Sequence, residues 1–215
     1  MKILFLLFDG LTALDAVGPY EVLARLPGAE VKFVGKTAGA IVTGDQRLRL
    51  GTDLALEDAT SCDLLVVPGG FGTRALERDE RVLDWVRKVD QTTSLTASVC
   101  TGSFVLAAAG LLKGRRATSH WAVRERLAEY GALPVGERMV RDGKYATAAG
   151  VSAGIDLALA LAVELCGREV AASIQLSIEY DPAPPLDAGS PDKAPKLLRD
   201  TLYERYQAKD RAARS

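Results

Sequence analysis

The stretch from Ser94 to Gly114, SLTASVCTGSFVLAAAGLLKG, places a cysteine between a strand pattern and a helix pattern. An apolar and partly β-branched run ends at Cys100, and an Ala- and Leu-rich run that is typical of a helix follows it closely. The stretch therefore predicts a strand, a sharp turn and a helix, with the thiol at the corner. Serine nucleophiles are presented on the same arrangement, which is called a nucleophile elbow.

Cys100 has two interpretations. At the corner of an elbow, its thiol would lie beside the free backbone N–H groups and the positive dipole end of the following helix. These groups favour the thiolate, so this interpretation predicts a thiol pKa below the ordinary value of about 8.5. The alternative is a buried cysteine that packs as a small apolar side chain. The Thr101-Gly102-Ser103 turn directly after the cysteine favours the reactive interpretation.

The rest of the sequence alternates between strand and helix patterns. Continuous apolar runs predict buried strands, and periodic apolar residues predict helices. We expect strands at residues 3–8, 30–34, 63–67, 93–99 and 116–118, a hairpin at 139–147, and a hairpin or two short edge strands within 40–50 around Thr43-Gly44-Asp45. We expect helices at residues 19–26, 73–89, 104–112, 121–130, 152–165, 168–178 and 196–211. This alternation predicts an α/β fold with a mainly parallel sheet and helices on both faces.

Length and composition limit the class of protein. With 215 residues, 48% of them hydrophobic, the chain can bury one full core, so we expect a single domain over residues 1–215. Five of the nine prolines lie between Asp181 and Pro195, which predicts an extended arm before the last helix. The 27 basic and 28 acidic residues nearly cancel, so neither nucleic acid nor a membrane surface is an expected partner.

Cysteine spacing and the N-terminal segment indicate the compartment. The apolar run at residues 3–8 is shorter than the roughly 7–15 residues of a secretory signal or the roughly 20 of a membrane span. Cys62, Cys100 and Cys166 lie far apart, and His120 is the only histidine. This pattern fits neither a disulfide framework nor a zinc site. We therefore expect a cytoplasmic protein with reduced thiols and no metal centre.

Three segments that follow predicted strands should meet at one edge of the sheet. In an open parallel sheet, ligands bind beyond the carboxyl ends of the strands. Asp15 follows the first strand, Gly69-Gly70 the third core strand and Cys100-Thr101 the strand of the elbow. Backbone N–H groups of the two glycines and of Thr101 would suit an anion or a developing negative charge. A simple turn is the alternative interpretation of the Gly-Gly pair.

Asp15 and His120 each have two interpretations. Asp15 lies among apolar residues, and its position alone favours a surface-facing carboxylate or a helix cap. If Asp15 instead lies beside the Cys100 thiol, burial and the thiolate charge would raise its pKa and suit it for proton transfer. His120 could orient the thiol, although a structural histidine beside Trp121 is equally compatible with the sequence.

Three motifs lie at these predicted strand ends. They are Val67-Pro68-Gly69-Gly70, Ser98-Val99-Cys100-Thr101-Gly102 and Thr118-Ser119-His120-Trp121. Together they resemble the ThiJ/PfpI superfamily, a flavodoxin-like group related to class I glutamine amidotransferases. Within it, the sequence is most similar to the isocyanide hydratases, and the likeness includes the arm at residues 179–185. Phe71 and Arg74 depart from the hydratase pattern and would reshape the pocket, so the likeness leaves the substrate's substituent open.

The resemblance implies a flavodoxin-like three-layer sandwich and an enzyme that converts isocyanides to N-formamides. It implies that Cys100 is the nucleophile, Asp15 the general acid and base, and Thr101 a supporting hydroxyl. The substrate or its developing charge would be bound by three further residues, which are Gly69, Gly70 and His120. The resemblance also implies a homodimer, and the chemistry that it assigns requires no metal or organic cofactor.

Other branches of the superfamily suggest alternative functions. Cys100 could be an oxidisable thiol in a stress-responsive protein that turns over no substrate. A glyoxalase- or deglycase-like activity is less favoured, because those branches carry glutamate where this chain has Asp15. Protease-like members often carry histidine next to the cysteine, where this chain has Thr101. Regulators of the superfamily carry a helix-turn-helix module, and we expect no room for one before Ser215.

Overall fold

The structure of the protein is a computed structural model, and it describes residues 1–44 and 47–214. The strands are β1 (Lys2–Leu6), β2 (Glu30–Gly35), β3 (Ile41–Thr43), β4 (Arg49–Gly51), β5 (Leu54–Ala55), β6 (Leu64–Val67), β7 (Leu95–Val99), β8 (Arg116–Ala117), β9 (Leu133–Pro134), β10 (Met139–Asp142) and β11 (Tyr145–Ala148). The helices are α1 (Ala13–Leu23), α2 (Thr73–Leu76), α3 (Glu80–Asp90), α4 (Gly102–Ala108), the 3₁₀ helix η1 (Arg124–Tyr130), α5 (Ala153–Cys166), α6 (Arg168–Ser177) and α7 (Lys196–Arg214). None of the helices among these described residues is long and apolar enough to cross a membrane.

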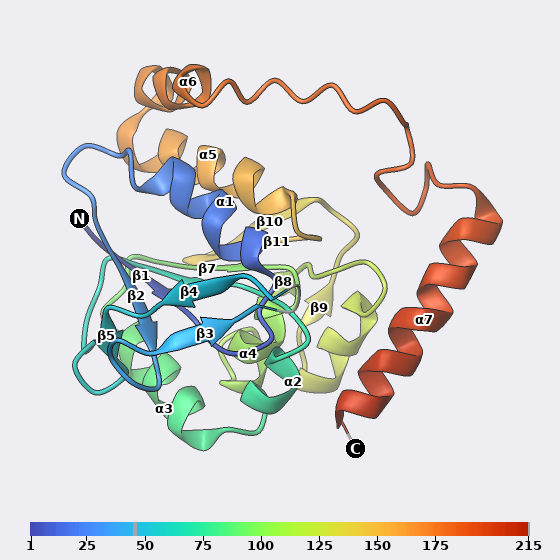
Figure 1. Ribbon diagram of the computed structural model, residues 1–215, viewed down its shortest axis with the longest axis horizontal. Coiled ribbons are helices and arrows are strands. Elements are labelled where there is room, and N and C mark those ends of the chain that lie inside the picture. The colour runs from blue at the N-terminus through green and yellow to red at the C-terminus, as the bar shows by residue number, and fades with distance from the viewer. Residues whose placement is uncertain (45–46, 215) are drawn as a thin grey trace.

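The centre of the molecule is a seven-stranded sheet in the order β10-β11-β7-β6-β1-β2-β5. Neighbouring strands pair in parallel, except that β10 and β11 form an antiparallel hairpin. Figure 1 shows α1 and α5 on one face of this sheet and α3 and α4 on the other. The predicted α/β fold, with a mainly parallel sheet between two layers of helices, is confirmed. The two-residue strands β5 and β9 were not predicted, because they are too short for any apolar pattern.

The central strands are mostly apolar in sequence because they are buried on both faces. Every residue of β6 and β7 is buried, and so are all residues of β1 after Lys2. Helices cover both faces of these strands, so their apolar residues run on without alternation. Because β1, β6 and β7 are adjacent and parallel, the segments that follow them meet at one edge of the sheet.

Two short strands, β3 and β4, pair in an antiparallel hairpin at the edge of the molecule, as the pattern within residues 40–50 predicted. The predicted pattern centres on residues 43–45, and of these residue 45 lies outside the described residues. The second predicted hairpin, β10–β11, is also confirmed. Its turn contains Gly143 at a φ of 59°, a conformation that glycine adopts without strain.

Helix α1 begins at Ala13, earlier than the start predicted at Pro19. Proline is favoured in the first turn of a helix and costs about 3 kcal/mol inside one, which is why the prediction was wrong. Pro19 lies inside α1, and the burial of Ala16, Pro19 and Val22 stabilises the helix across it. The earlier start places Asp15 in the first turn of α1 rather than in a loop.

Two other predicted helices differ from the structure. The helix predicted at 73–89 is divided into α2 and α3, because the Asp79 side chain accepts a hydrogen bond from the Val82 N–H (3.3 Å) and caps a new helix. Apolar residues that recur at helical spacing in this segment are all buried, namely Leu76, Val82, Trp85, Val86 and Val89. The α-helix predicted at 121–130 is the shorter 3₁₀ helix η1, which ends at Gly131 with a φ of 75°.

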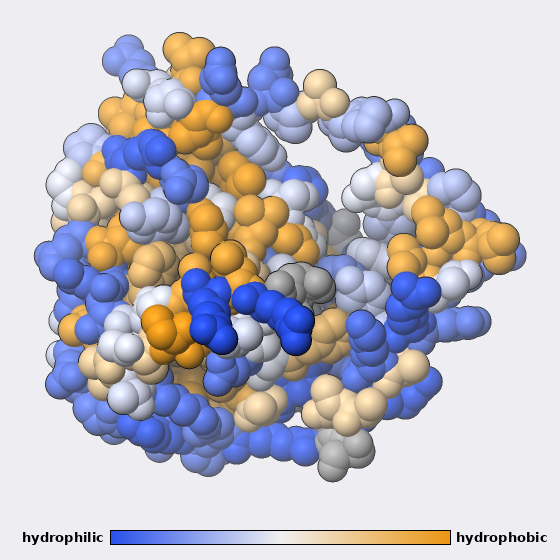
Figure 2. All heavy atoms as spheres, viewed as in Figure 1, coloured by the Kyte–Doolittle hydropathy of each residue, from blue (hydrophilic) through white to orange (hydrophobic). Residues whose placement is uncertain are grey.

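The C-terminal part of the chain leaves the body of the molecule and returns to it. Residues 181–195 form an extended arm whose side chains are mostly exposed. Figure 1 shows the arm leading from α6 to α7, and Figure 2 shows open space between the arm and the rest of the molecule. Helix α7 packs beside α2, next to the sheet edge at which the predicted site residues meet.

Gly102 is the first residue of α4, and a Cβ there would stand 2.0 Å from the Val67 carbonyl oxygen, far inside contact distance. Replacing Gly102 by alanine should push α4 away from β6 and lower the free energy of unfolding by about 1–3 kcal/mol. Chemical denaturation of the two proteins measures this difference. Gly189→Ala is the matched control, because a Cβ at Gly189 meets nothing within 4 Å. Equal losses in the two variants would contradict the close packing.

Candidate active site

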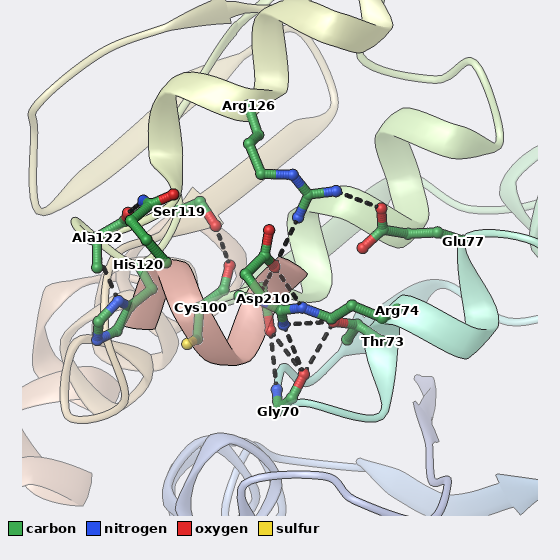
Figure 3. A network of polar contacts seen from close by, with 12 residues as sticks. Gly70, Thr73, Arg74, Glu77, Cys100, Ser119, His120, Ala122, Arg126 and Asp210 are labelled. Carbon is green, nitrogen blue, oxygen red and sulfur yellow. Dashed lines mark hydrogen bonds and ion pairs between the residues drawn. The ribbon is translucent and has the colours of Figure 1, made fainter. Parts of the chain in front are cut away.

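Cys100 lies directly after β7 and before α4, at the corner of the predicted elbow. Its φ of 54° is in the left-handed region, which a residue with a side chain adopts only where its surroundings hold it. Its backbone N–H lies 3.0 and 2.9 Å from the carbonyl oxygens of Ala148 and Ala149. Its carbonyl oxygen accepts hydrogen bonds from the hydroxyls of Ser103 (3.1 Å) and Ser119 (2.9 Å; Figure 3). The predicted nucleophile elbow is confirmed.

Asp15 meets Cys100 inside the molecule. Its side chain is 0% exposed, so the interpretation as a surface carboxylate was wrong, because the first turn of α1 faces the sheet edge. The Gly69 N–H donates a hydrogen bond to Asp15 Oδ2 at 2.9 Å. A Cβ on Gly69 would stand 2.8 Å from both Asp15 Oδ2 and Cys100 Cβ. The lack of a side chain at Gly69 is therefore what lets the carboxylate and the cysteine approach each other.

The pKa of the Cys100 thiol is raised, opposite to the prediction. Burial is the main cause, and the Asp15 carboxylate adds to it. The backbone N–H groups of Thr101 and Val151 and the charge of Arg74 lower this pKa but do not cancel the rise. The prediction considered the N–H groups of the elbow and omitted burial, although Cys100 is only 5% exposed. The thiol therefore keeps its proton, and the neighbouring carboxyl group of Asp15 is placed to serve as the base that removes it.

The Thr101 hydroxyl holds the Gly-Gly turn in place. It accepts a hydrogen bond from the Gly70 N–H (2.9 Å) and donates one to the Gly70 carbonyl oxygen (3.0 Å). Both N–H groups of the turn thus donate to protein side chains, Gly69 to Asp15 and Gly70 to Thr101. That the Gly69 and Gly70 N–H groups bind a substrate or its developing negative charge stays a prediction. Val151, whose N–H reaches the Cys100 sulfur, was missed because it follows a strand far along the sequence.

His120 is a buried and neutral side chain. Its Nδ1 accepts a hydrogen bond from the Ala122 N–H at 3.3 Å, which leaves Nε2 to carry the proton of the neutral ring. Burial and the charge of Arg74 lower the pKa of His120 to about 4. Figure 3 shows the Cys100 sulfur pointing toward the side on which the His120 ring lies. Contact between this ring and a substrate stays a prediction.

A cavity of about 50 Å³ lies over Cys100. Its walls join the segment after β6, the elbow and two aromatic residues from distant parts of the chain, His120 and Tyr206. The Tyr206 ring centre lies 4.6 Å from that of His120 and 6.0 Å from that of Phe71. A larger cavity of about 470 Å³ also touches His120 and is lined in part by arm residues 189–192, but Cys100 is not in its wall. The thiol faces the smaller cavity.

A buried cluster of four charged side chains joins α7 to this site (Figure 3). Asp210 Oδ1 lies 2.7 Å from Arg74 Nε and 3.1 Å from Arg126 Nη1, and Arg126 Nη2 lies 2.8 Å from Glu77 Oε2. Two positive and two negative charges balance, as burial of charged groups requires. Arg74 also donates to the Gly70 carbonyl oxygen at 3.1 Å, which connects α7 to the turn beside Cys100. Sequence reasoning missed these partners, which lie up to 136 positions apart.

The other two cysteines lie outside the cavity over Cys100. Cys62 is buried, and this burial raises its pKa to about 12. Cys166 is half-buried at the end of α5. Within the part of the chain that the structure describes, no group of three His, Cys, Asp or Glu side chains could hold a metal ion.

Known proteins identify the family. The sequence profile of the DJ-1/PfpI family matches residues 1–164. The chain belongs to the DJ-1/PfpI family. An isonitrile hydratase of Pseudomonas putida is 47% identical to it over 205 residues, which are 95% of this chain and 90% of that protein. The deglycase PfpI of Pyrococcus furiosus is 29% identical over 67% of this chain and 87% of that protein.

A solved structure extends the likeness to the C-terminal part. The crystal structure of a ThiJ/PfpI family protein from Pseudomonas syringae has a TM-score of 0.95 to this chain and is 38% identical. It covers 99% of this chain and 88% of its own, so the match includes α7, which lies beyond the family profile. The predicted superfamily and its flavodoxin-like fold are confirmed.

His120 makes stability depend on pH. Its pKa is about 4 in the folded protein and about 6.5 when unfolded, so between these values the unfolded chain binds the extra proton. Acidification from pH 6.5 to 4 should therefore lower the free energy of unfolding through this residue by about 3 kcal/mol. In His120→Asn, whose amide oxygen can accept the Ala122 bond, the unfolding free energy should fall less over this range. Denaturation at each pH measures both curves, and parallel curves would contradict the account.

Proposed function

We propose that this protein hydrates isonitriles, R–N≡C, to N-substituted formamides, with Cys100 as nucleophile and Asp15 as general acid and base. The observation that carries the proposal is the meeting of these two buried side chains at Gly69. The terminal carbon of an isonitrile must receive a nucleophile and a proton, and these are the groups that the pair can supply. The 47% identity to an isonitrile hydratase supports this reaction.

In the first step, Asp15 removes the thiol proton while the sulfur of Cys100 bonds to the terminal carbon. Asp15 then returns that proton to the carbon, which gives a thioimidate, R–N=CH–S, on Cys100. The step has no net gain or loss of protons. The raised pKa of the thiol makes the neighbouring base necessary, since the sulfur is not ionised in advance. The N–H groups of Thr101 and Val151 stabilise charge on the sulfur during the transfer.

In the second step, a water molecule adds to the thioimidate carbon. Asp15 takes one proton from the water and passes it to the nitrogen. It then takes the second proton from the new hydroxyl and passes it to the sulfur as the carbon–sulfur bond breaks. The products are R–NH–CHO and the free thiol of Cys100, so one water is consumed in each cycle. In this scheme Thr101 is a supporting residue, because its hydroxyl holds the turn whose Gly69 N–H fixes Asp15. The neutral His120 supplies an Nε2–H that can donate to the substrate nitrogen.

The burial of Cys100 and the sequence identities favour this reaction over the redox-sensing and deglycase alternatives. Redox-sensing cysteines are exposed and have a low pKa, whereas Cys100 is buried and its pKa is raised. The deglycase PfpI is less similar to this chain than the isonitrile hydratase, at 29% against 47% identity.

We also infer that the chain forms a homodimer. Three large apolar side chains of the C-terminal part are strongly exposed in the single chain, Leu176 (77%), Leu186 (74%) and Leu197 (81%). A second copy that covered them would remove this apolar surface from water. Sedimentation equilibrium tests the inference, and we expect twice the mass of one chain.

The reaction is tested with n-butyl isonitrile, by following loss of the isonitrile and formation of the formamide. The freshly reduced wild type should form the formamide. Cys100→Ala should remove turnover, because no other group can form the covalent intermediate. Asp15→Asn should lower kcat by about 10²–10⁴, the usual contribution of a general acid and base.

Cys166→Ala is the matched control, because this thiol lies outside the site and its loss should leave turnover unchanged. A wild type that forms no formamide, or a Cys100→Ala protein that does, would refute the proposed function. Parallel assays with methylglyoxal test the deglycase alternative, which would gain support if only the aldehyde were consumed.

A further inference from the structure

Helix α7 places an aromatic ring over the candidate nucleophile. Tyr206 lies in the wall of the cavity that holds Cys100, and its ring contacts those of His120 and Phe71. The proposed proton transfers make no use of Tyr206. The residue also lies beyond residues 1–164, which the family profile matches. We therefore infer a role for Tyr206 from where its side chain lies.

The Tyr206 ring is held in place by the charged cluster of α7. Asp210 lies four residues after Tyr206, so the two side chains share one face of the helix. Asp210 is 2% exposed and forms ion pairs with Arg74 and Arg126. Since Arg74 also donates to the Gly70 carbonyl oxygen, the helix, the turn and the elbow form one connected unit. The ring is therefore a fixed wall of the site.

The shape of an isonitrile directs its substituent toward this wall. The C≡N–R unit is linear, so when the terminal carbon reaches the Cys100 sulfur, R points away from the sulfur. The cavity of about 50 Å³ is far smaller than the roughly 300–1,000 Å³ of a typical small-molecule pocket. The substituent must therefore lie against the rings of Phe71, His120 and Tyr206, which border the cavity.

We propose that Tyr206 determines which isonitrile substituents the site accepts. Its ring narrows the cavity, so the site favours slender apolar substituents and excludes those that are branched at the carbon bonded to nitrogen, because branching makes the substituent wider where it passes the ring. This inference rests on the proposed function, since it assigns the substrate class of the same site. Tyr206 is thus a specificity-determining residue that lies far from Cys100 in the sequence.

Two isomeric substrates test the proposal, n-butyl isonitrile and tert-butyl isonitrile. The measured quantity is the ratio of kcat/KM for the tert-butyl to the n-butyl compound, in which the intrinsic reactivities cancel between variants. Tyr206→Ala should raise this ratio at least about tenfold, the usual effect of opening space in an apolar pocket. Tyr206→Phe keeps the ring and should leave the ratio within about twofold of the wild type.

Tyr203→Ala is the matched control on the same helix. The Tyr203 ring contacts Trp121 (6.2 Å between ring centres) and is not part of the cavity wall. This variant should leave the ratio unchanged, and far-ultraviolet circular dichroism checks that α7 remains folded in each protein. An unchanged ratio in Tyr206→Ala, or an equal rise in Tyr203→Ala, would overturn the proposal.

A second readout requires no turnover and separates this proposal from the proposed function. Alkylation of Cys100 by N-methylmaleimide and N-tert-butylmaleimide is measured by mass spectrometry. Tyr206→Ala should speed the bulky reagent relative to the small one by about tenfold, and Tyr203→Ala should not. If the wild type hydrates no isonitrile, the proposed function fails, and the two alkylation rates still decide whether Tyr206 limits access. Equal acceleration of both reagents would contradict that role.

Discussion

The approach of a buried carboxylate to a buried cysteine, with only the glycine backbone between them, is the constraint on which the rest of the site depends. Asp15, Gly69 and Cys100 come from the segments after β1, β6 and β7, which are adjacent parallel strands of one sheet. Their carboxyl ends meet at one edge, so three residues that are distant in sequence reach one point. The left-handed backbone of Cys100 and its hydrogen bonds keep the cysteine at that point.

Burial determines how such a site can perform its chemistry. An exposed thiol at a helix start would ionise readily, but Cys100 is desolvated and lies beside a carboxylate, and both effects oppose the thiolate. In the reaction that we propose, the nucleophile is produced by proton transfer from the Cys100 thiol to Asp15 at the moment of attack. Neutral His120 and the balanced Arg74–Glu77–Arg126–Asp210 cluster add no net charge to this environment.

The sequence predicted what depends on local pattern. Apolar runs identified the central strands, and the short turn after Cys100 identified the elbow. The burial of Asp15 was not predictable from its position, because it depends on where α1 begins, and tertiary packing across Pro19 decides that. The predicted direction of the Cys100 pKa shift was wrong for the same reason, since the desolvation of the thiol depends on the whole fold. Tyr206 and Asp210 carried no local signal, because their partners lie across the sequence.

The most direct test of the account is the pH dependence of Cys100 alkylation by iodoacetamide, followed by mass spectrometry in the wild type and in Asp15→Asn. The Asp15 carboxylate raises the pKa of the thiol, so its neutralisation should shift the alkylation profile of Cys100 to lower pH. Asp187→Asn, at an exposed carboxylate on the arm, should leave the profile unchanged. A profile that stays in place or moves to higher pH in Asp15→Asn would contradict the pairing of Asp15 with Cys100.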